Sequence, residues 1–195
     1  MKKVFFSTIL FGILSTQVHA DYLPSQQSTS AQAARYSTMG FNDLLSEAKA
    51  GQPAAQFYVA TRYQAGREVS KDPNQAFFWY KKAADQGISA AQLNVGRMLV
   101  EGIGTGKNEK LGRQYLEKAA SHGDNRASFN LALIEEHNKN YMNAYQWYEL
   151  STRDGMLDNK VIDMSQTKKT ALAANLTPEQ IRQAVDRADK WIQAQ

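Results

Sequence analysis

One short stretch of the chain has the residue types of a phosphate-binding loop. Residues 102–107 read Gly-Ile-Gly-Thr-Gly-Lys, and loops of this composition can cradle phosphates with backbone N–H groups. Such a loop follows a strand, opens a helix and carries Ser or Thr after its lysine. Here Asn108 follows the lysine, and the segments on both sides have helical patterns. The stretch is therefore predicted to connect two helices and not to bind a nucleotide.

A second stretch, Ser121-His122-Gly123-Asp124, contains the three residue types of a hydrolytic triad. Consecutive residues in a turn cannot converge on one proton-transfer line, and a triad is defined by its geometry. Beyond the first twenty residues the only histidines are His122 and His137, and neither has a second metal ligand at helical spacing. We therefore predict no catalytic residue, no metal site and no cofactor.

The charge and cysteine content exclude several other classes of function. The formal charge of +4 includes Lys2 and Lys3, and without these two residues it is +2. This excess is too small to indicate binding to nucleic acid or to an anionic membrane surface. The absence of cysteine excludes disulfides and a cysteine-linked lipid anchor. The carboxylates of Asp85, Glu135 and Glu136 are predicted to be solvated charges on helix faces or helix ends.

The first twenty residues have the plan of a signal peptide. Lys2 and Lys3 precede a short apolar run from Val4 to Leu14, and Val18-His19-Ala20 forms a small-x-small cleavage site. The apolar run is too short for a membrane span. We expect cleavage before Asp21 and no membrane insertion afterwards. The expected compartment is the periplasm of a bacterium, with release into the medium as the alternative.

The chain repeats itself with a period of 36 residues. Gly51, Gly87 and Gly123 are separated by this interval, and the third copy closes at Gly155 after only 32 residues. Self-similarity at such a period is typical of stacked repeat proteins. Each copy has an aromatic residue at the same distance before its closing glycine, and these residues are Trp79, Tyr115 and Trp147. The four-residue deletion should therefore lie in the loop between the two helices of the third copy.

Each copy has the pattern of two helices, and in the first copy these are expected near residues 53–65 and 74–86. Its sequence runs A-A-Q-F-Y-V-A-x-x-Y-x-x-G and later W-Y-K-K-A-A-D-Q-G. This frame closely resembles Sel1-like repeats, which are related to tetratricopeptide repeats. The resemblance covers roughly residues 41–155. It implies an all-α, right-handed solenoid of helix pairs with capping helices at its ends.

On this basis the chain divides into a leader, a tether, a cap, a repeat array and a C-terminal cap. A helix is expected near residues 161–174, and a capped helix should begin at Thr177. The predicted boundaries are a signal peptide at 1–20, a tether without fixed structure at 21–39, a half-repeat cap at 40–51, repeats at 52–87, 88–123 and 124–155, and capping helices at 156–195.

The resemblance also predicts which positions face a partner. In tetratricopeptide-like repeats, certain positions of the first helix of each pair line the concave side. Two equivalent sets fall on such positions, and Arg126 lies at the start of the third copy. The predicted partner-binding residues are Phe57, Leu93 and Phe129 as an apolar ladder, Thr61, Arg97 and Leu133 as a mixed edge, and Arg126. For the ladder, packing between neighbouring helices is the competing interpretation.

These observations predict a periplasmic adaptor or scaffold that binds another protein or a peptide, for example in the assembly of an envelope or secretion machine. The chain is expected to be monomeric. An alternative is an immunity protein that neutralises a toxin delivered to the periplasm. A hydrolase is less favoured, because the secreted Sel1-like relatives linked to β-lactams are rich in cysteine and this chain has none.

Overall fold

The computed structural model describes residues 31–153 and 159–195, and every regular element in these ranges is a helix. The predicted leader and Gly155 lie outside them. The chain divides into two compact units, residues 1–39 and 40–195. In the first unit residues 31–38 are helical, so the prediction of a tether without fixed structure was wrong for this part. The reason is local, because Ala31, Ala33 and Ala34 have the highest intrinsic helix propensity.

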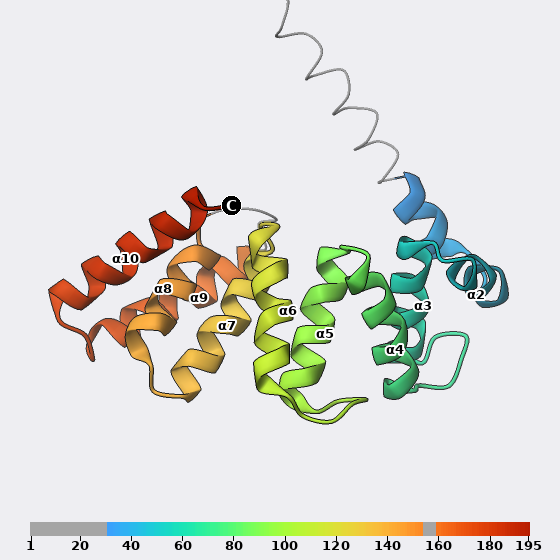
Figure 1. Ribbon diagram of the computed structural model, residues 1–195, viewed down its shortest axis with the longest axis horizontal. Helices are drawn as coiled ribbons and strands as arrows, with labels where there is room; N and C mark the ends of the chain where they lie inside the picture. The colour runs from blue at the N-terminus through green and yellow to red at the C-terminus, as the bar shows by residue number, and fades with distance from the viewer. Residues whose placement is uncertain (1–30, 154–158) are drawn as a thin grey trace, which may run out of the picture. The chain divides into compact units, whose positions relative to one another are not determined.

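The second unit begins with one helix and continues as helix pairs (Figure 1). The first helix, α2, spans Phe41–Lys49 and packs on α3. The pairs are α3 (Pro53–Ala65) with α4 (Pro73–Asp85), α5 (Ser89–Glu101) with α6 (Glu109–Ser121), and α7 (Asn125–His137) with α8 (Tyr141–Ser151). Each helix contacts its successor. The predicted all-α solenoid of helix pairs is confirmed, and the helix ranges of the first pair agree with the expected ones to within one residue.

Local signals explain where the helices start and stop. Pro53 and Pro73 occupy the first turns of α3 and α4, where a missing N–H group breaks no helical hydrogen bond. The α4 N-terminus is capped by Asp72, whose carboxylate accepts hydrogen bonds from the backbone N–H groups of two following residues. Gly66 and Gly102 end α3 and α5 in the left-handed conformation, with φ of 69° and 75°.

The four-residue deletion of the third repeat lies in its inter-helix loop, as predicted. Seven residues join α3 to α4 and also α5 to α6, whereas only residues 138–140 join α7 to α8. The helices themselves keep their register. Trp79, Tyr115 and Trp147 are 6%, 7% and 6% exposed in the three repeats, so each packs into the stack at the same place.

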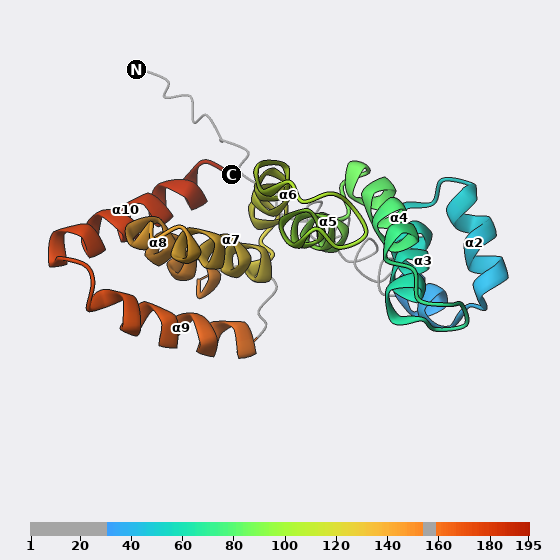
Figure 2. The same cartoon turned by 90° about the horizontal axis from the view of Figure 1, so that it is seen from below.

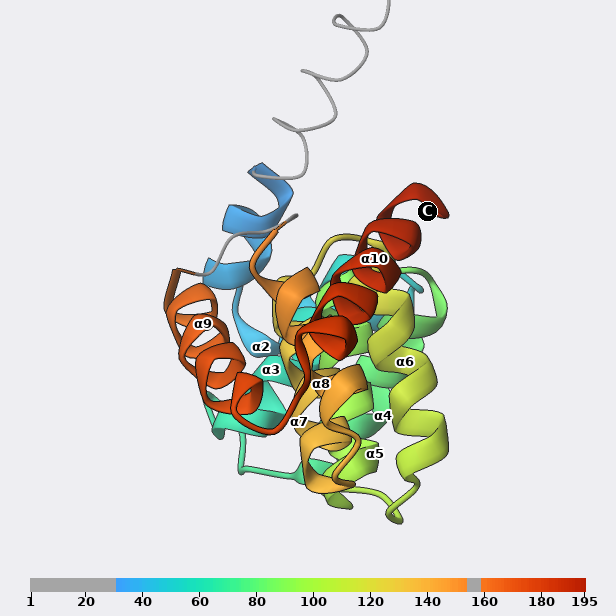
Figure 3. The same cartoon turned by 90° about the vertical axis from the view of Figure 1, so that its left-hand side faces the viewer.

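The C-terminal segment covers the last repeat from two sides. Helix α9 spans Asn159–Ala173 and α10 spans Pro178–Gln193. Figures 2 and 3 show α8 lying between them, and both helices contact α8. Thr177 caps α10 in the predicted capping box with Gln180. Among the described residues, no helix is long and apolar enough to cross a membrane.

Packing and ion pairs together attach the C-terminal helices to α8. The rings of Trp147 and Trp191 meet edge to face with centroids 4.9 Å apart. Glu149 on α8 pairs with Lys169 of α9 and with Arg153, and Arg153 also pairs with Asp189 of α10. Burial would raise the pKa of Glu149, but hydrogen bonds and charge from Lys169 and Arg153 hold it below its ordinary 4.5.

The carboxylates predicted to be solvated have specific partners. Glu135 is the clear error, since its side chain is only 5% exposed and pairs with Arg113 at 2.5 Å. Asp85 is half-exposed but accepts a hydrogen bond of 2.8 Å from the Tyr115 hydroxyl. A single-sequence helical pattern does not reveal which exposed-looking charge will face the next helix pair, and this caused the error.

Candidate functional site

Two of the three residues of the predicted apolar ladder are part of the core. Leu93 and Phe129 are 5% and 7% exposed, and Phe57 is partly buried. In the first and third repeats the ladder residue packs on a tyrosine of its own second helix. The ring centroids are 5.6 Å apart for Phe57 and Tyr80, and 5.5 Å apart for Phe129 and Tyr148. For Leu93 and Phe129 the burial favours the competing interpretation, packing between neighbouring helices, whereas for Phe57 the partner-binding role stays a prediction.

The second predicted set is more accessible. The Arg97 side chain is 43% exposed and its guanidinium lies 3.8 Å from the Glu101 carboxylate. Leu133 is 38% exposed, which is high for a leucine. Thr61 is partly buried, and its hydroxyl donates to the Tyr58 carbonyl oxygen at 2.7 Å. Arg97 and Leu133 line one pocket, and Thr61 is not among its lining residues.

Arg126 has a structural partner that the sequence analysis did not foresee. Its guanidinium binds both carboxylate oxygens of Asp124, at 3.0 and 2.7 Å. Asp124 is fully buried and also caps the N-terminus of α7. Arg126, predicted as a partner-binding residue, therefore also has a role in the fold. A buried carboxylate needs a cation or several donors nearby, and Arg126 supplies the cation.

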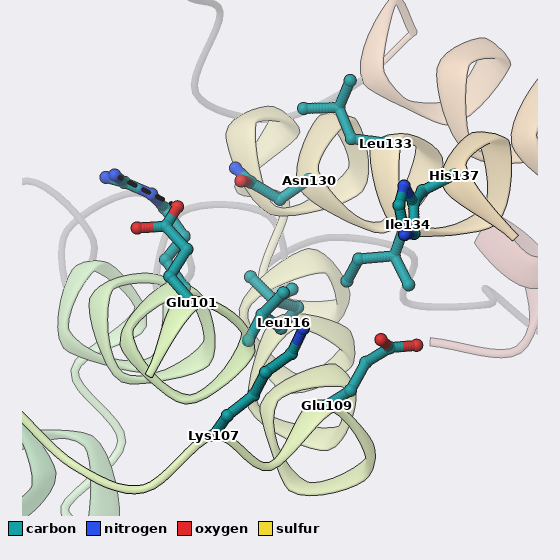
Figure 4. A pocket seen from close by; sticks show the side chains of 10 residues that line it. Glu101, Lys107, Glu109, Leu116, Asn130, Leu133, Ile134 and His137 are labelled. Atoms are coloured by element: carbon teal, nitrogen blue, oxygen red, sulfur yellow. Dashed lines mark ion pairs between the residues drawn. The ribbon is translucent and has the colours of Figure 1, made fainter. Parts of the chain in front are cut away.

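The pocket that contains Arg97 and Leu133 lies between the second and third repeats (Figure 4). We call it the repeat-two pocket, and its volume is about 190 Å³. Its floor is apolar and its rim carries charges. Its lining residues are Arg97, Val100 and Glu101 of α5, Lys107 of the following loop, Glu109 and Leu116 of α6, and Asn130, Leu133, Ile134 and His137 of α7.

The pocket lies beside a position where the second repeat lacks an aromatic residue that the other two have. Leu116 occupies the place of Tyr80 in the first repeat and of Tyr148 in the third. The Tyr80 hydroxyl donates to Gln64 Oε1 and the Tyr148 hydroxyl donates to Glu136 Oε2, both at 2.6 Å. In the second repeat the acceptor position holds Val100. The two residues that replace this tyrosine and its acceptor therefore both line the pocket.

Two glycines bring the helices of the second repeat close together beside the pocket. A Cβ atom at Gly96 would lie 2.6 Å from Leu116 Cγ and 2.9 Å from the Gly112 carbonyl oxygen. One at Gly112 would lie 2.7 Å from Val100 Cγ2. Alanines stand at the equivalent places of the other repeats. The contact fixes the positions of Val100 and Leu116, so the floor of the pocket is held by backbone packing.

The rim carries charges of both signs. Arg97 pairs with Glu101, and Glu109 Oε1 accepts a hydrogen bond of 3.1 Å from Asn138 Nδ2. Lys107 has no ion-pair partner within residues 31–153 and 159–195. In Figure 4 its side chain extends from the loop towards Leu116. The site can thus offer an apolar floor and a rim of mixed charge on which Lys107 is a cation without an ion-pair partner among the described residues.

The motifs that suggested chemistry have structural explanations. Ser121 Oγ donates to the Lys118 carbonyl oxygen at 2.8 Å, and His122 Nδ1 lies 2.7 Å from the same oxygen. Asp124 is paired with Arg126, so the three residues form no relay. Gly104, with φ of 67°, packs against the Pro73 carbonyl group, where a side chain would not fit. Within the described residues, no cluster of His, Cys, Asp or Glu has the arrangement of a metal site.

Sequence reasoning found two residues of the pocket and missed the others. The signal was available, since Leu116 and Val100 are the places where the second copy departs from an otherwise shared tyrosine and polar acceptor. The predicted site residues occupy positions that are equivalent between the copies, whereas Val100 and Leu116 differ from the residues at their equivalent positions.

Comparison with known proteins supports the repeat assignment. The family model "Sel1 repeat" matches residues 53–88, 89–124 and 127–156, just over half of the chain. The crystal structure of a Sel1 repeat protein from Oxalobacter formigenes superposes with a TM-score of 0.55 and 26% identity, over 74% of each chain.

Curated relatives include fungal regulatory proteins. A chitin synthase regulator of Malassezia restricta, SKT5, is 39% identical over 63 residues, which are 32% of this chain and 4% of the relative. Chitin synthase regulatory factor 3 of Schizosaccharomyces pombe is 35% identical over 98 residues, 48% of this chain and 10% of the relative. The chain thus spans a tenth or less of their length. From the matched repeats, their helix pairs and the solved relative, the chain belongs to the Sel1 repeat family.

Proposed function

We propose that this protein is an exported adaptor that captures a partner protein at the repeat-two pocket. The observation that supports this most is the pairing of an apolar cavity with an exposed leucine, Leu133, on helices that are otherwise closely packed. Stacked helix pairs present extended surfaces that bind other proteins. An apolar pocket with a few polar groups at its rim is the usual form of an anchor site in such surfaces.

The compartment follows from the leader. Lys2, Lys3, the short apolar run and the Val18-His19-Ala20 site favour export to the periplasm, where the mature chain begins at Asp21. The N-terminal sequence of protein from a periplasmic fraction should be Asp21-Tyr22-Leu23. Recovery of intact Met1 in the membrane fraction would contradict export by cleavage.

The adaptor role has indirect support from the relatives, which are named as regulators of chitin synthase. A regulator of this kind acts on another protein. Because the chain covers only a small part of those relatives, their target is not transferred. The partner proposed for this chain is a protein of the envelope or of a secretion machine.

Site-specific crosslinking in living cells tests the proposal. A photoreactive phenylalanine analogue is placed at Leu133, on the pocket, or at Phe78, which is 48% exposed and lies on α4 outside the pocket. We expect a discrete crosslinked species from the Leu133 position and none of the same mass from Phe78. Equal products from both positions, or a product from Phe78 alone, would place the partner elsewhere.

A further inference from the structure

The first and third repeats show what kind of group fits the position that is empty in the second. In both, a tyrosine ring from the second helix lies against the first helix of its own repeat, and Tyr80 and Tyr148 are each about fully buried, at 1% and 0% exposure. In the second repeat, Leu116 stands at this place, and it lines the pocket together with Val100, which stands at the acceptor's place. The chain itself therefore identifies an aromatic ring as the group that completes this part of the stack.

The size of the pocket agrees with a ring. Its volume is about 190 Å³, and a dry cavity of about 150 Å³ lined by Leu, Ile and Phe binds benzene. Val100, Leu116 and Ile134 supply the apolar surface for such a ring. Leu116 is fully buried and Ile134 is 8% exposed, so the floor is formed before any partner arrives.

The charge at the edge favours an aromatic over an aliphatic occupant. Arg97, Lys107, Glu101 and Glu109 line the pocket, and because Arg97 pairs with Glu101, Lys107 is the cation left to meet an occupant. The face of an aromatic ring carries negative electrostatic potential and attracts a cation within about 6 Å of its centroid. The same arrangement occurs elsewhere in this chain, where Lys82 lies 5.1 Å from the centre of the Phe78 ring. A leucine or isoleucine side chain would gain nothing from Lys107.

We infer that the repeat-two pocket is an acceptor for an aromatic side chain of the partner protein, which inserts where Tyr80 and Tyr148 stand in the neighbouring repeats. This inference rests on the proposed function and specifies the chemistry of the partner. The inserted ring contacts Val100, Leu116 and Ile134 and presents its face to Lys107 at the rim of the pocket. The partner's ring thus takes the place in the packing that Tyr80 and Tyr148 take in the first and third repeats.

The test uses small probes, so that its outcome is separate from the crosslinking experiment. N-acetylphenylalaninamide and N-acetylleucinamide are titrated into the full mature protein labelled at its methyl groups. A ring that enters the pocket shifts the methyl resonances of Val100, Leu116, Leu133 and Ile134 through its ring current. We expect saturable shifts with the phenylalanine probe, with binding at least about twofold tighter than for the leucine probe, as a cation–π contribution at an exposed site provides. Lys107→Met should reduce this preference.

A matched variant fills the pocket with the side chains that occupy the equivalent positions of the first repeat. Leu116→Tyr with Val100→Gln introduces the tyrosine and acceptor of the first repeat. We expect the phenylalanine probe to bind this variant at least tenfold more weakly. The reciprocal variant, Tyr80→Leu with Gln64→Val, should create a second ring-binding site between the first and second repeats. It serves as the test if the filled variant does not fold.

Two results would overturn the inference. One is a wild-type protein whose pocket methyl resonances do not respond to the phenylalanine probe at millimolar concentrations. The other is equal binding to the wild type and to the folded Leu116→Tyr/Val100→Gln variant. A crosslink at Leu133 together with either result would leave the adaptor function standing and reject the aromatic occupant. Probe binding without any crosslink at Leu133 would support the ring-binding pocket while rejecting this face as the protein-binding surface.

Discussion

The second and third repeats follow one plan but fill it with different side chains. In the third repeat, Tyr148 closes the space between α7 and α8 and its hydroxyl reaches Glu136. In the second repeat, Leu116 and Val100 stand at these places, and the backbones approach at Gly96 and Gly112. The pocket beside Leu116 opens between α5, α6 and α7, away from the close contact at the two glycines. The smaller residues of the second repeat therefore allow α5 and α6 to pack closely on one side, while a pocket remains on the other side beside Leu116.

The two repeats also differ in the interactions that hold their helices in place. The third repeat is attached by charges to its surroundings, through Glu135 to Arg113 of α6 and through Glu136 to Lys168 of α9. Within the second repeat, α5 and α6 are in close backbone contact at Gly96 and Gly112. The two regions should consequently respond to different perturbations, and four predictions separate them.

The largest effect is expected from Gly112→Ala in the second repeat. The new methyl group would lie 2.7 Å from Val100 Cγ2 and 2.8 Å from the Gly96 carbonyl oxygen, and the backbone cannot move away cheaply. Overpacking of this kind should lower the free energy of unfolding by about 2–3 kcal/mol, although alanine stands at the equivalent places 76 and 144.

Urea denaturation measures this change. Gly106→Ala is the matched control, because nothing lies within 4 Å of a Cβ atom there. If both variants unfold at the same urea concentration as the wild type, the close approach of α5 and α6 is not a feature of the folded protein.

The next effect is expected from Arg126→Ala at the start of the third repeat. This change removes the bidentate partner of the fully buried Asp124 and should cost about 2 kcal/mol, less than for a fully buried pair because Arg126 is partly exposed. Arg97→Ala, at an exposed pair, should cost less than about 0.5 kcal/mol.

Thermal melting of the single variants and of Arg126→Ala combined with Asp124→Asn gives the comparison. Asparagine keeps an oxygen that can cap α7 and carries no charge, so the double variant should recover part of the loss. A double variant no more stable than Arg126→Ala alone would show that the charge of Asp124 is not what Arg126 compensates.

A smaller effect is expected from removing the tyrosine hydroxyls. Tyr148→Phe loses a hydrogen bond of 2.6 Å to the carboxylate of Glu136, and Tyr80→Phe loses one of the same length to the neutral Gln64. Hydrogen bonds to charged groups are the stronger ones. We expect a cost of about 1.5 kcal/mol for Tyr148→Phe and about 1 kcal/mol for Tyr80→Phe, measured by chemical denaturation. The reverse order would mean that the charge of Glu136 is already satisfied by Lys168.

The smallest effect is a loss of stability in acid at the C-terminal cap. The pKa values of Glu136 and Glu149 are held below 4.5 in the folded protein, against burial, by their hydrogen-bonding and cationic neighbours. A lowered carboxyl pKa stabilises the folded state above the unfolded pKa. That stabilisation is lost as the pH falls from about the ordinary 4.5 through the folded values.

The melting temperature should therefore decrease below pH 5, and the decrease should be smaller in Glu149→Gln. Hydrogen exchange at low pH should show α9 and α10 opening before α5 and α6, since Glu136 and Glu149 pair with Lys168 and Lys169 of α9, and Arg153 links Glu149 to Asp189 of α10. Opening of α5 and α6 first would contradict this division.

Much of the fold follows from the sequence by local rules. The period of 36 residues, the prolines and cap residues at helix starts, and the glycines after helix ends predict the helix pairs and their boundaries. The position of the deletion could be predicted because a loop can shorten without disturbing two packed helices. The helix at residues 31–38 was missed because the segment was judged by its polar residues and not by its high alanine content.

The candidate site could be predicted only in part. Arg97 and Leu133 were identified because their equivalent positions line a binding surface in related repeats. Phe57, Leu93 and Phe129 occupy equally regular positions and are core residues or partly buried. Helical spacing shows that residues share a face, but it does not show how deeply the neighbouring helix covers that face.

The sequence by itself determined that this chain is a stack of helix pairs, because periodicity, capping and small residues act over a few turns of helix. The tertiary structure alone decided that the Asp124 carboxylate is buried beside a partly exposed Arg126, that Glu135 reaches Arg113 on another helix, and that a pocket remains beside Leu116. The physical reason is that a cavity is the difference between the volume that surrounding helices enclose and the volume that their side chains fill. That difference depends on distances between residues far apart in the chain, which no local pattern contains.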